Sequence, residues 1–128
     1  ESLRFIGQKN SDAKLAALTA ALDIANDSYL DNSKEPGRKV GQPDNKASHF
    51  FVAQYWAKAL GEGADADLAA KFAPVAQELI EKEDTIIAEL LAAEGKAQDI
   101  GGYYHPDDAK AEAAMRPSAT LNAIIDAI

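Results

Sequence analysis

The chain has 128 residues, of which 47% are hydrophobic and 27% charged, a composition that suits one folded domain and argues against intrinsic disorder. Its 21 acidic and 13 basic residues give a net charge of −8, which disfavours general binding to nucleic acid or to an anionic membrane. The absence of cysteine excludes disulfide scaffolds, thiolate zinc sites and thiol nucleophiles, and favours the cytoplasm as the location.

The first thirty residues predict two helices. Leu3 and Ile6 are spaced like the last turn of a helix that Gly7 closes. Ser11 is a suitable N-cap for a second helix over about residues 12–30, where apolar residues recur every three or four positions.

The sequence shows no sign of membrane insertion or secretion. No stretch of the chain approaches the ~18 consecutive apolar residues of a membrane span, and the first ten residues lack the pattern of a signal peptide. Because the chain opens at Glu1 and its only methionine is Met115, we expect that Glu1 is not a translation start.

An irregular stretch precedes a third helix. Residues 31–43 contain two prolines and two glycines, so they cannot continue a helix, and Asp44 is a suitable cap for a helix that ends at Gly61. Aromatic residues spread around more than one side of this helix, which predicts a central core helix. The alternative is that part of this surface docks against another domain. The aromatic residues are Phe50, Phe51, Tyr55 and Trp56.

An apolar stripe over residues 68–90 predicts one long helix or two. Pro74 lies inside the stripe, where it removes a backbone donor and crowds the preceding turn, so we expect a break or kink just before it. Gly95 ends the pattern.

The last thirty residues predict a loop and two short helices. Residues 99–106 form a loop or a short extended piece, a helix from Asp107 to Arg116 stops at Pro117, and Ser118 caps the final helix. The chain therefore predicts a mainly α fold, a compact bundle of five to six helices with irregular loops, as a single helical unit over residues 1–128.

A basic cluster stands out in this acidic chain as a candidate anion site. It comprises Lys34, Arg38, Lys39, Lys46 and His49. Arginine offers a planar fork of donors, and the helix beginning near residue 44 is expected to point free N–H groups at the same region. Together these groups could bind a phosphate or a carboxylate, whereas the alternative is a solvated loop whose charges only aid solubility.

Other polar residues give no clear site. His49 and His105 are too few and too far apart for a metal site, so we expect a packing residue and a loop residue. Four carboxylates alternate with the apolar stripe as a solvent face does. They are Glu78, Glu81, Glu83 and Asp84.

The run from Arg38 to Phe50, Arg-Lys-Val-Gly-Gln-Pro-Asp-Asn-Lys-Ala-Ser-His-Phe, resembles a segment of the monomeric-type NADP-dependent isocitrate dehydrogenases. Further matches follow in family order and cover most of the chain. They are Ala53-Gln-Tyr-Trp-Ala57, Phe72-Ala-Pro74, Asp99-Ile-Gly-Gly-Tyr-Tyr-His-Pro106 and Arg116-Pro-Ser-Ala-Thr120.

The resemblance implies the C-terminal portion of the cofactor-bearing domain of a larger α/β enzyme. That monomeric enzyme of the tricarboxylic acid cycle converts isocitrate to 2-oxoglutarate and reduces NADP, with Mg or Mn held by aspartates outside this segment. The motif assigns Arg38 to the 2′-phosphate of NADP, while Lys39 and His49 receive no role from it. The segment is then expected to contain no catalytic or metal-binding residue, and to be inactive alone.

Two hypotheses follow about partners. In the first, the partners are the remainder of the same polypeptide and, in the parent enzyme, NADP and isocitrate, with no nucleic acid and no membrane. In the second, the chain is a free-standing helical protein-interaction module with an anion-binding loop. An upstream region carrying the family's aspartates would favour the first hypothesis, and a start codon just before Glu1 would favour the second.

Overall fold

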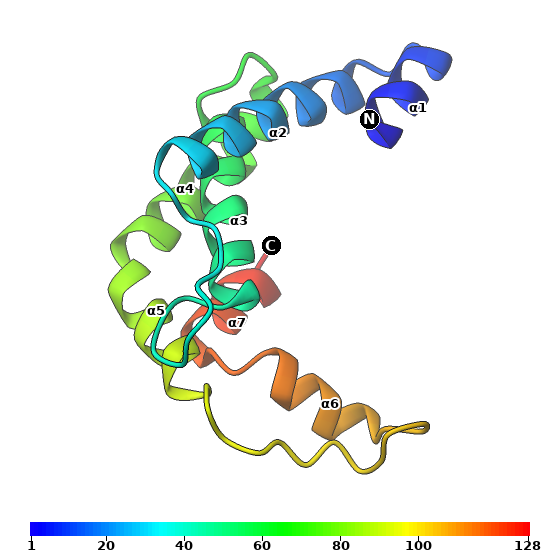
Figure 1. Ribbon diagram of the computed structural model, residues 1–128. Helices are drawn as coiled ribbons and strands as arrows, with labels where there is room; N and C mark the ends of the chain where they lie inside the picture. Colours follow the sequence, from blue (N-terminus) through cyan, green and yellow to red (C-terminus); the bar gives the residue numbers. More distant parts are fainter.

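The computed structural model describes residues 1–128 as seven helices joined by loops, without strands. The mainly α prediction is confirmed, with one helix more than the five to six expected. The helices follow an arc, with α1 at one end and α6 at the other (Figure 1). They are α1 (Ser2–Asn10), α2 (Ala13–Asp31), α3 (Asn45–Gly61), α4 (Ala66–Glu81), α5 (Glu83–Ala92), α6 (Asp108–Met115) and α7 (Ala119–Asp126).

Side-chain N-caps set the starts of five helices, because each cap oxygen accepts a hydrogen bond from a backbone N–H that has no partner within the helix. Asp44 and Ser118 cap α3 and α7, as the sequence predicted. Asp12, Asp65 and Asp107 cap α2, α4 and α6.

The boundary between α1 and α2 corrects the sequence prediction twice. Gly7 does not close the first helix but lies buried inside it, where an added Cβ would approach Leu15 Cβ to 3.1 Å. Ser11 is not the cap of α2 but the left-handed residue that ends α1, with φ 53°. Asp12 takes the cap because its carboxylate accepts from two backbone N–H groups at the start of α2.

α3 is the central helix, as its aromatic residues predicted. It packs against α2 and α4 and also contacts α5. Phe50 and Phe51 are both nearly inaccessible, with ring centroids 5.2 Å apart. Ile86 of α5 and Leu79 of α4 complete the same apolar cluster. Trp56 is half-buried, and its indole N–H donates to the Leu18 carbonyl of α2 at 3.0 Å.

Of the break or kink expected before Pro74, the break is wrong, because α4 runs through this proline without interruption. Pro74 and Ala70, whose carbonyl loses its helical partner, are both exposed, so water can satisfy that carbonyl. The apolar face meanwhile continues past the proline to Leu79. The chain breaks instead at Lys82, which ends α4 and precedes α5 with φ −102° and ψ 9°.

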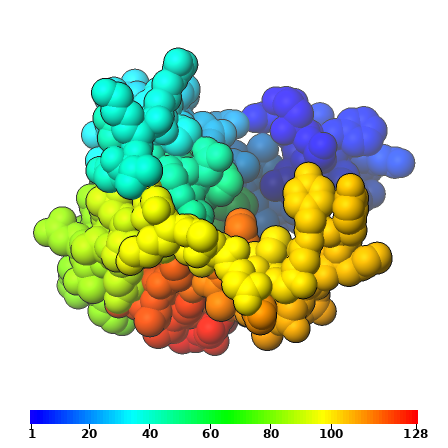
Figure 2. All heavy atoms as spheres, turned by 60° about the horizontal axis from the view of Figure 1, so that its bottom comes forward, coloured from blue at the N-terminus to red at the C-terminus, as the bar shows by residue number.

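The segment after α5 forms an arm that extends from the helical body. In Figure 2 the stretch between α5 and α6, drawn in yellow, crosses the face of the molecule and ends in a protruding tip. The loop of residues 99–106 has no helix or strand, as predicted, and α6 has no buried residue. Tyr103 and Tyr104 are 87% and 86% exposed, and their rings meet edge to face.

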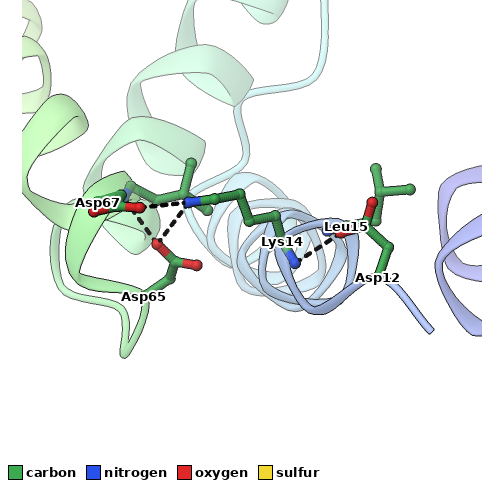
Figure 3. A network of polar contacts seen from close by, with 6 residues as sticks. Asp12, Lys14, Leu15, Asp65 and Asp67 are labelled. Carbon is green, nitrogen blue, oxygen red and sulfur yellow. Dashed lines mark hydrogen bonds and ion pairs between the residues drawn. The ribbon is translucent and has the colours of Figure 1, made fainter.

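A charged contact joins the start of α2 to the start of α4 (Figure 3). The Lys14 ammonium lies 2.9 Å from Asp67 and 3.4 Å from Asp65. The pKa of Asp65 is lowered, first by the hydrogen bond from the Leu68 backbone N–H and then by Lys14. None of the seven helices combines the length and the apolar character that a membrane crossing requires.

Candidate functional site

The basic motif lies on a turn over residues 37–43, here named the Arg38 turn. The turn closes on itself, because the Gly37 N–H donates to the Pro43 carbonyl at 2.7 Å. The side-chain oxygen of Gln42 accepts from the backbone N–H groups of Arg38 at 3.1 Å and Lys39 at 3.2 Å. These bonds define the shape of the turn and occupy the backbone N–H groups of residues 37–39, which are then unavailable to an anion.

The Arg38 turn rests against the end of α5, as the teal loop in Figure 1 shows. The Gly41 N–H donates to Oε2 of Glu94 at 2.8 Å. Gly41 has φ 85°, a conformation that glycine adopts without a steric penalty. Beside it, Val40 packs so closely on Gly95 that an added Cβ on this glycine would lie 2.9 Å from Val40 Cγ1.

The two cationic side chains of the turn lie in solvent. Arg38 and Lys39 are exposed and take part in no ion pair. Lys34 differs from them, because it is half-buried and its ammonium lies 4.2 Å from the centroid of the Phe51 ring. Two unpaired cations on a turn of defined shape are a donor set that fits a phosphate.

The start of α3 does not offer the free N–H groups that the sequence suggested. Asp44 accepts from the backbone N–H groups of Lys46 at 2.9 Å and Ala47 at 3.1 Å, and its carboxylate also pairs with the Lys46 ammonium. Partial burial acts to raise the pKa of Asp44, but the hydrogen bonds from Lys46 and Ala47 outweigh it and lower the pKa. The negative cap therefore satisfies the helix terminus and neutralises Lys46.

Neither histidine side chain takes part in a hydrogen bond or an ion pair. His49 is exposed on α3, which corrects the expectation of a packing residue, and His105 is exposed in the loop before α6, as expected. No three His, Asp or Glu side chains come together as a metal site would require. Glu83 is half-buried and accepts from the Gln54 amide at 2.8 Å, whereas the other three carboxylates of the predicted solvent face are exposed.

Two carboxylates in structural roles escaped the sequence analysis. Glu94 holds the Arg38 turn from 53 residues away. Glu89 of α5 accepts from the Ser118 hydroxyl at 2.6 Å and from the Thr120 N–H at 3.1 Å and hydroxyl at 2.9 Å. These bonds lower the pKa of Glu89, with the Ser118 hydroxyl the largest contribution. The N-cap signal at Ser118 was visible in the sequence, but no spacing rule connects either carboxylate to its partner.

An apolar groove opens between the core and the final helix. Twelve residues line it, all of them apolar, from α2, α3, α4, α7 and the residues that follow α7. Ile125 and Ile128 on its edge are 47% and 48% exposed. An open groove with a wholly apolar lining is typical of a surface that packs against further protein.

Comparison with known proteins gives one consistent family. The profile of a family described as monomeric isocitrate dehydrogenase matches residues 1–126. The chain is 46% identical to an NADP isocitrate dehydrogenase 2 of Colwellia maris over 128 residues, which are 99% of this chain and 17% of that protein. It is also 46% identical to the NADP isocitrate dehydrogenase of Azotobacter vinelandii, over 97% of this chain and 17% of that protein. The identity to the NADP isocitrate dehydrogenase of Corynebacterium glutamicum is likewise 46%, over 100% of this chain and 18% of that protein.

Proposed function

Because this chain belongs to the monomeric isocitrate dehydrogenase family, we propose that it serves as the C-terminal part of an NADP-dependent enzyme and supplies Arg38 to the 2′-phosphate of NADP. The observation that carries the proposal is the Arg38 turn, which presents an unpaired guanidinium on a hydrogen-bonded scaffold. Family membership favours this function over a free-standing interaction module.

The chemistry of the turn suits a 2′-phosphate. This group carries close to two negative charges near neutral pH, and an arginine fork can donate two parallel hydrogen bonds to its oxygens. NAD lacks the group, so an arginine at this place favours NADP over NAD. Lys39 adds a second exposed cation on the same turn. When bound, NADP supplies the acceptor for the hydride that isocitrate loses.

The rest of the reaction is assigned to the remainder of the polypeptide. The chain spans 17% or 18% of the length of the curated relatives, so most of an enzyme of that length lies outside it. We assign the binding of isocitrate, the Mg or Mn ion and the conversion to 2-oxoglutarate to that portion, in a cytoplasmic enzyme. The apolar groove is the surface that we expect the same portion to cover.

Replacement of Arg38 by alanine in the full-length enzyme tests the phosphate contact. A charge-assisted hydrogen bond to a phosphate is worth roughly a tenfold change in affinity or more, so the KM for NADP should rise by about ten- to a hundredfold. The KM for isocitrate should change less than about twofold, because the proposal gives the turn a contact with the 2′-phosphate of NADP alone. Lys58→Ala controls for a general loss of charge, because Lys58 is also an exposed and unpaired cation but lies on α3, outside the turn. An unchanged KM for NADP in Arg38→Ala would exclude the proposed role.

The groove is tested by a pair of matched substitutions on apolar side chains of nearly equal exposure. Ile125 lies in the groove and is 47% exposed, whereas Ile80 lies outside it and is 48% exposed. In the full-length enzyme, Ile125→Asp should lower thermal stability more than Ile80→Asp, because only the first charge would be buried against further chain. In the 128-residue chain alone, the two variants should lose similar, small amounts. Equal losses in the full-length enzyme would contradict the docking of this groove.

The isolated chain should bind NADP weakly at most. A single phosphate contact cannot offset the entropy that a dinucleotide loses on association. Isothermal titration of the 128-residue chain with NADP should therefore show no saturable heat at micromolar concentrations of ligand. Tight binding would mean that the chain contains a complete cofactor site, and would favour an independent binding module.

A further inference from the structure

We propose that Glu94 is a positioning residue, which holds the Arg38 turn where its guanidinium can meet the 2′-phosphate of NADP. This inference rests on the proposed function of Arg38. It adds a second residue to the site, one that acts through the backbone of the turn without touching the cofactor.

The hydrogen bond between Glu94 and Gly41 is the only hydrogen bond that joins the turn to the helical body. The other hydrogen bonds of residues 37–43 run within the turn, from Gly37 to Pro43, from Gln42 to Lys39, and to the Gln42 side chain. Internal bonds determine the shape of a loop but leave its place on the protein free. Oε2 of Glu94, which accepts from the Gly41 N–H at 2.8 Å, is therefore the one hydrogen-bond acceptor of the helical body that helps to fix the place of the Arg38 turn.

The surroundings of Glu94 make this contact specific. Glu94 is half-buried two residues after the end of α5, and its second oxygen, Oε1, is buried without a hydrogen-bond partner. Gly95 follows with φ 68° and brings its Cα against Val40 of the turn. The end of α5 thus contacts the turn twice, once through a charged acceptor and once through close packing.

The charge of Glu94 has the wrong sign for a direct role in phosphate binding. A carboxylate near the 2′-phosphate repels it and reduces the benefit of Arg38. What the residue contributes is therefore an acceptor at a defined point. A glutamine in its place retains a carbonyl acceptor and removes the negative charge. The two functions of the side chain can thus be separated by substitution.

The experiment measures the kinetics of four variants of the full-length enzyme, namely Glu94→Ala, Glu94→Gln, Arg38→Ala and the double variant Arg38→Ala/Glu94→Ala. Glu94→Ala should raise the KM for NADP by roughly three- to tenfold, since the turn loses a hydrogen bond to a charged group but keeps its internal bonds. The KM for isocitrate should move less than about twofold. Glu94→Gln should restore most of the affinity for NADP that Glu94→Ala loses.

The double variant shows whether Glu94 acts through Arg38. If it does, Glu94→Ala should add less than about twofold to the KM for NADP once Arg38 is already alanine. A full multiplicative effect in the double variant would overturn the inference, as would a KM for Glu94→Gln as high as that of Glu94→Ala. Arg38→Ala without effect refutes the proposed function itself, whereas an effect of Arg38→Ala and none of Glu94→Ala refutes the positioning role alone.

A second variant protects the test against misfolding. Gly95→Ala leaves the Glu94 carboxylate in place but puts a Cβ against Val40 in a left-handed conformation, so it should displace the turn and raise the KM for NADP. Thermal melting identifies the variants that remain folded. If Glu94→Ala does not fold, a folded Gly95→Ala or Glu94→Gln decides the question. An unchanged KM for NADP in Gly95→Ala would contradict the positioning role. A raised KM for NADP in Glu94→Gln would contradict it as well.

Discussion

Replacement of Gly61 by alanine tests how closely α3 and α4 approach each other. Gly61 is the last residue of α3, and a Cβ added there would lie 2.8 Å from Ala73 Cα, 3.0 Å from Ala73 N and 3.2 Å from Ala73 Cβ. The two nearest atoms belong to the backbone, so no change of rotamer relieves the contact. The helices would have to move apart, which loosens the packing between α3 and α4.

Two effects of opposite sign determine the result. Alanine favours a helix over glycine by about 0.5–1 kcal/mol, and Gly61 has no left-handed φ that would oppose the change. Overpacking at a close contact costs about 1–3 kcal/mol. Because the contacting backbone atoms cannot move aside, we expect the cost of Gly61→Ala to lie in the upper part of that range. We therefore expect Gly61→Ala to lower the free energy of unfolding by roughly 1–2 kcal/mol.

Urea denaturation followed by far-UV circular dichroism measures this change. The midpoint should fall while the slope m stays the same, since the surface exposed on unfolding is nearly unchanged. Gly7→Ala is the matched control, because its added Cβ would meet the Leu15 side chain at 3.1 Å and no backbone atom closer than 3.6 Å. This variant should lose less stability than Gly61→Ala, because its added Cβ is farther from its nearest neighbour and needs a smaller shift of the helices. A Gly61→Ala protein as stable as the unsubstituted chain would refute backbone contact between α3 and α4.

Three further predictions concern the links between helices. Ser118→Ala removes the buried hydroxyl that accepts from the Leu121 N–H and donates to Glu89. Urea denaturation should show that the free energy of unfolding falls by about 1–2 kcal/mol, and a fall below about 0.5 kcal/mol would contradict the cap. The lowered pKa of Glu89 means that its ionised form stabilises the fold above the ordinary carboxyl range, and that this contribution disappears as the pH falls. The difference in urea midpoint between the unsubstituted chain and Glu89→Gln should accordingly shrink below about pH 4, and a constant difference would exclude the linkage. Lys14→Ala should cause only a small loss that added salt reduces further, because its ion pairs are exposed, and a large loss insensitive to salt would be inconsistent with this geometry.

Local sequence patterns predicted most of the helices. Asp44 and Ser118 could be identified as caps because a cap and the N–H groups that it satisfies lie within three residues of each other. The errors arose at two residues whose local signal for the end of a helix did not decide the structure. Gly7 carries a stop signal but lies inside α1, because close packing against α2 needs a residue without a side chain there. Pro74 carries a break signal, yet its exposed position lets α4 continue.

The sequence alone determined a mainly α fold, the position of the irregular stretch before α3 and the motif that singles out Arg38. The first two features depend on composition, on helical periodicity and on interactions within a few residues, whereas the choice of Arg38 depends on the resemblance of its motif to that of a known family. Only the folded structure decided which cations of the basic cluster stay unpaired, since Lys46 pairs with Asp44 two residues away and Lys34 lies over the Phe51 ring of α3. It alone also placed Glu94 against the Arg38 turn, because a contact across 53 residues depends on the packing of α5 and leaves no periodic trace in the chain.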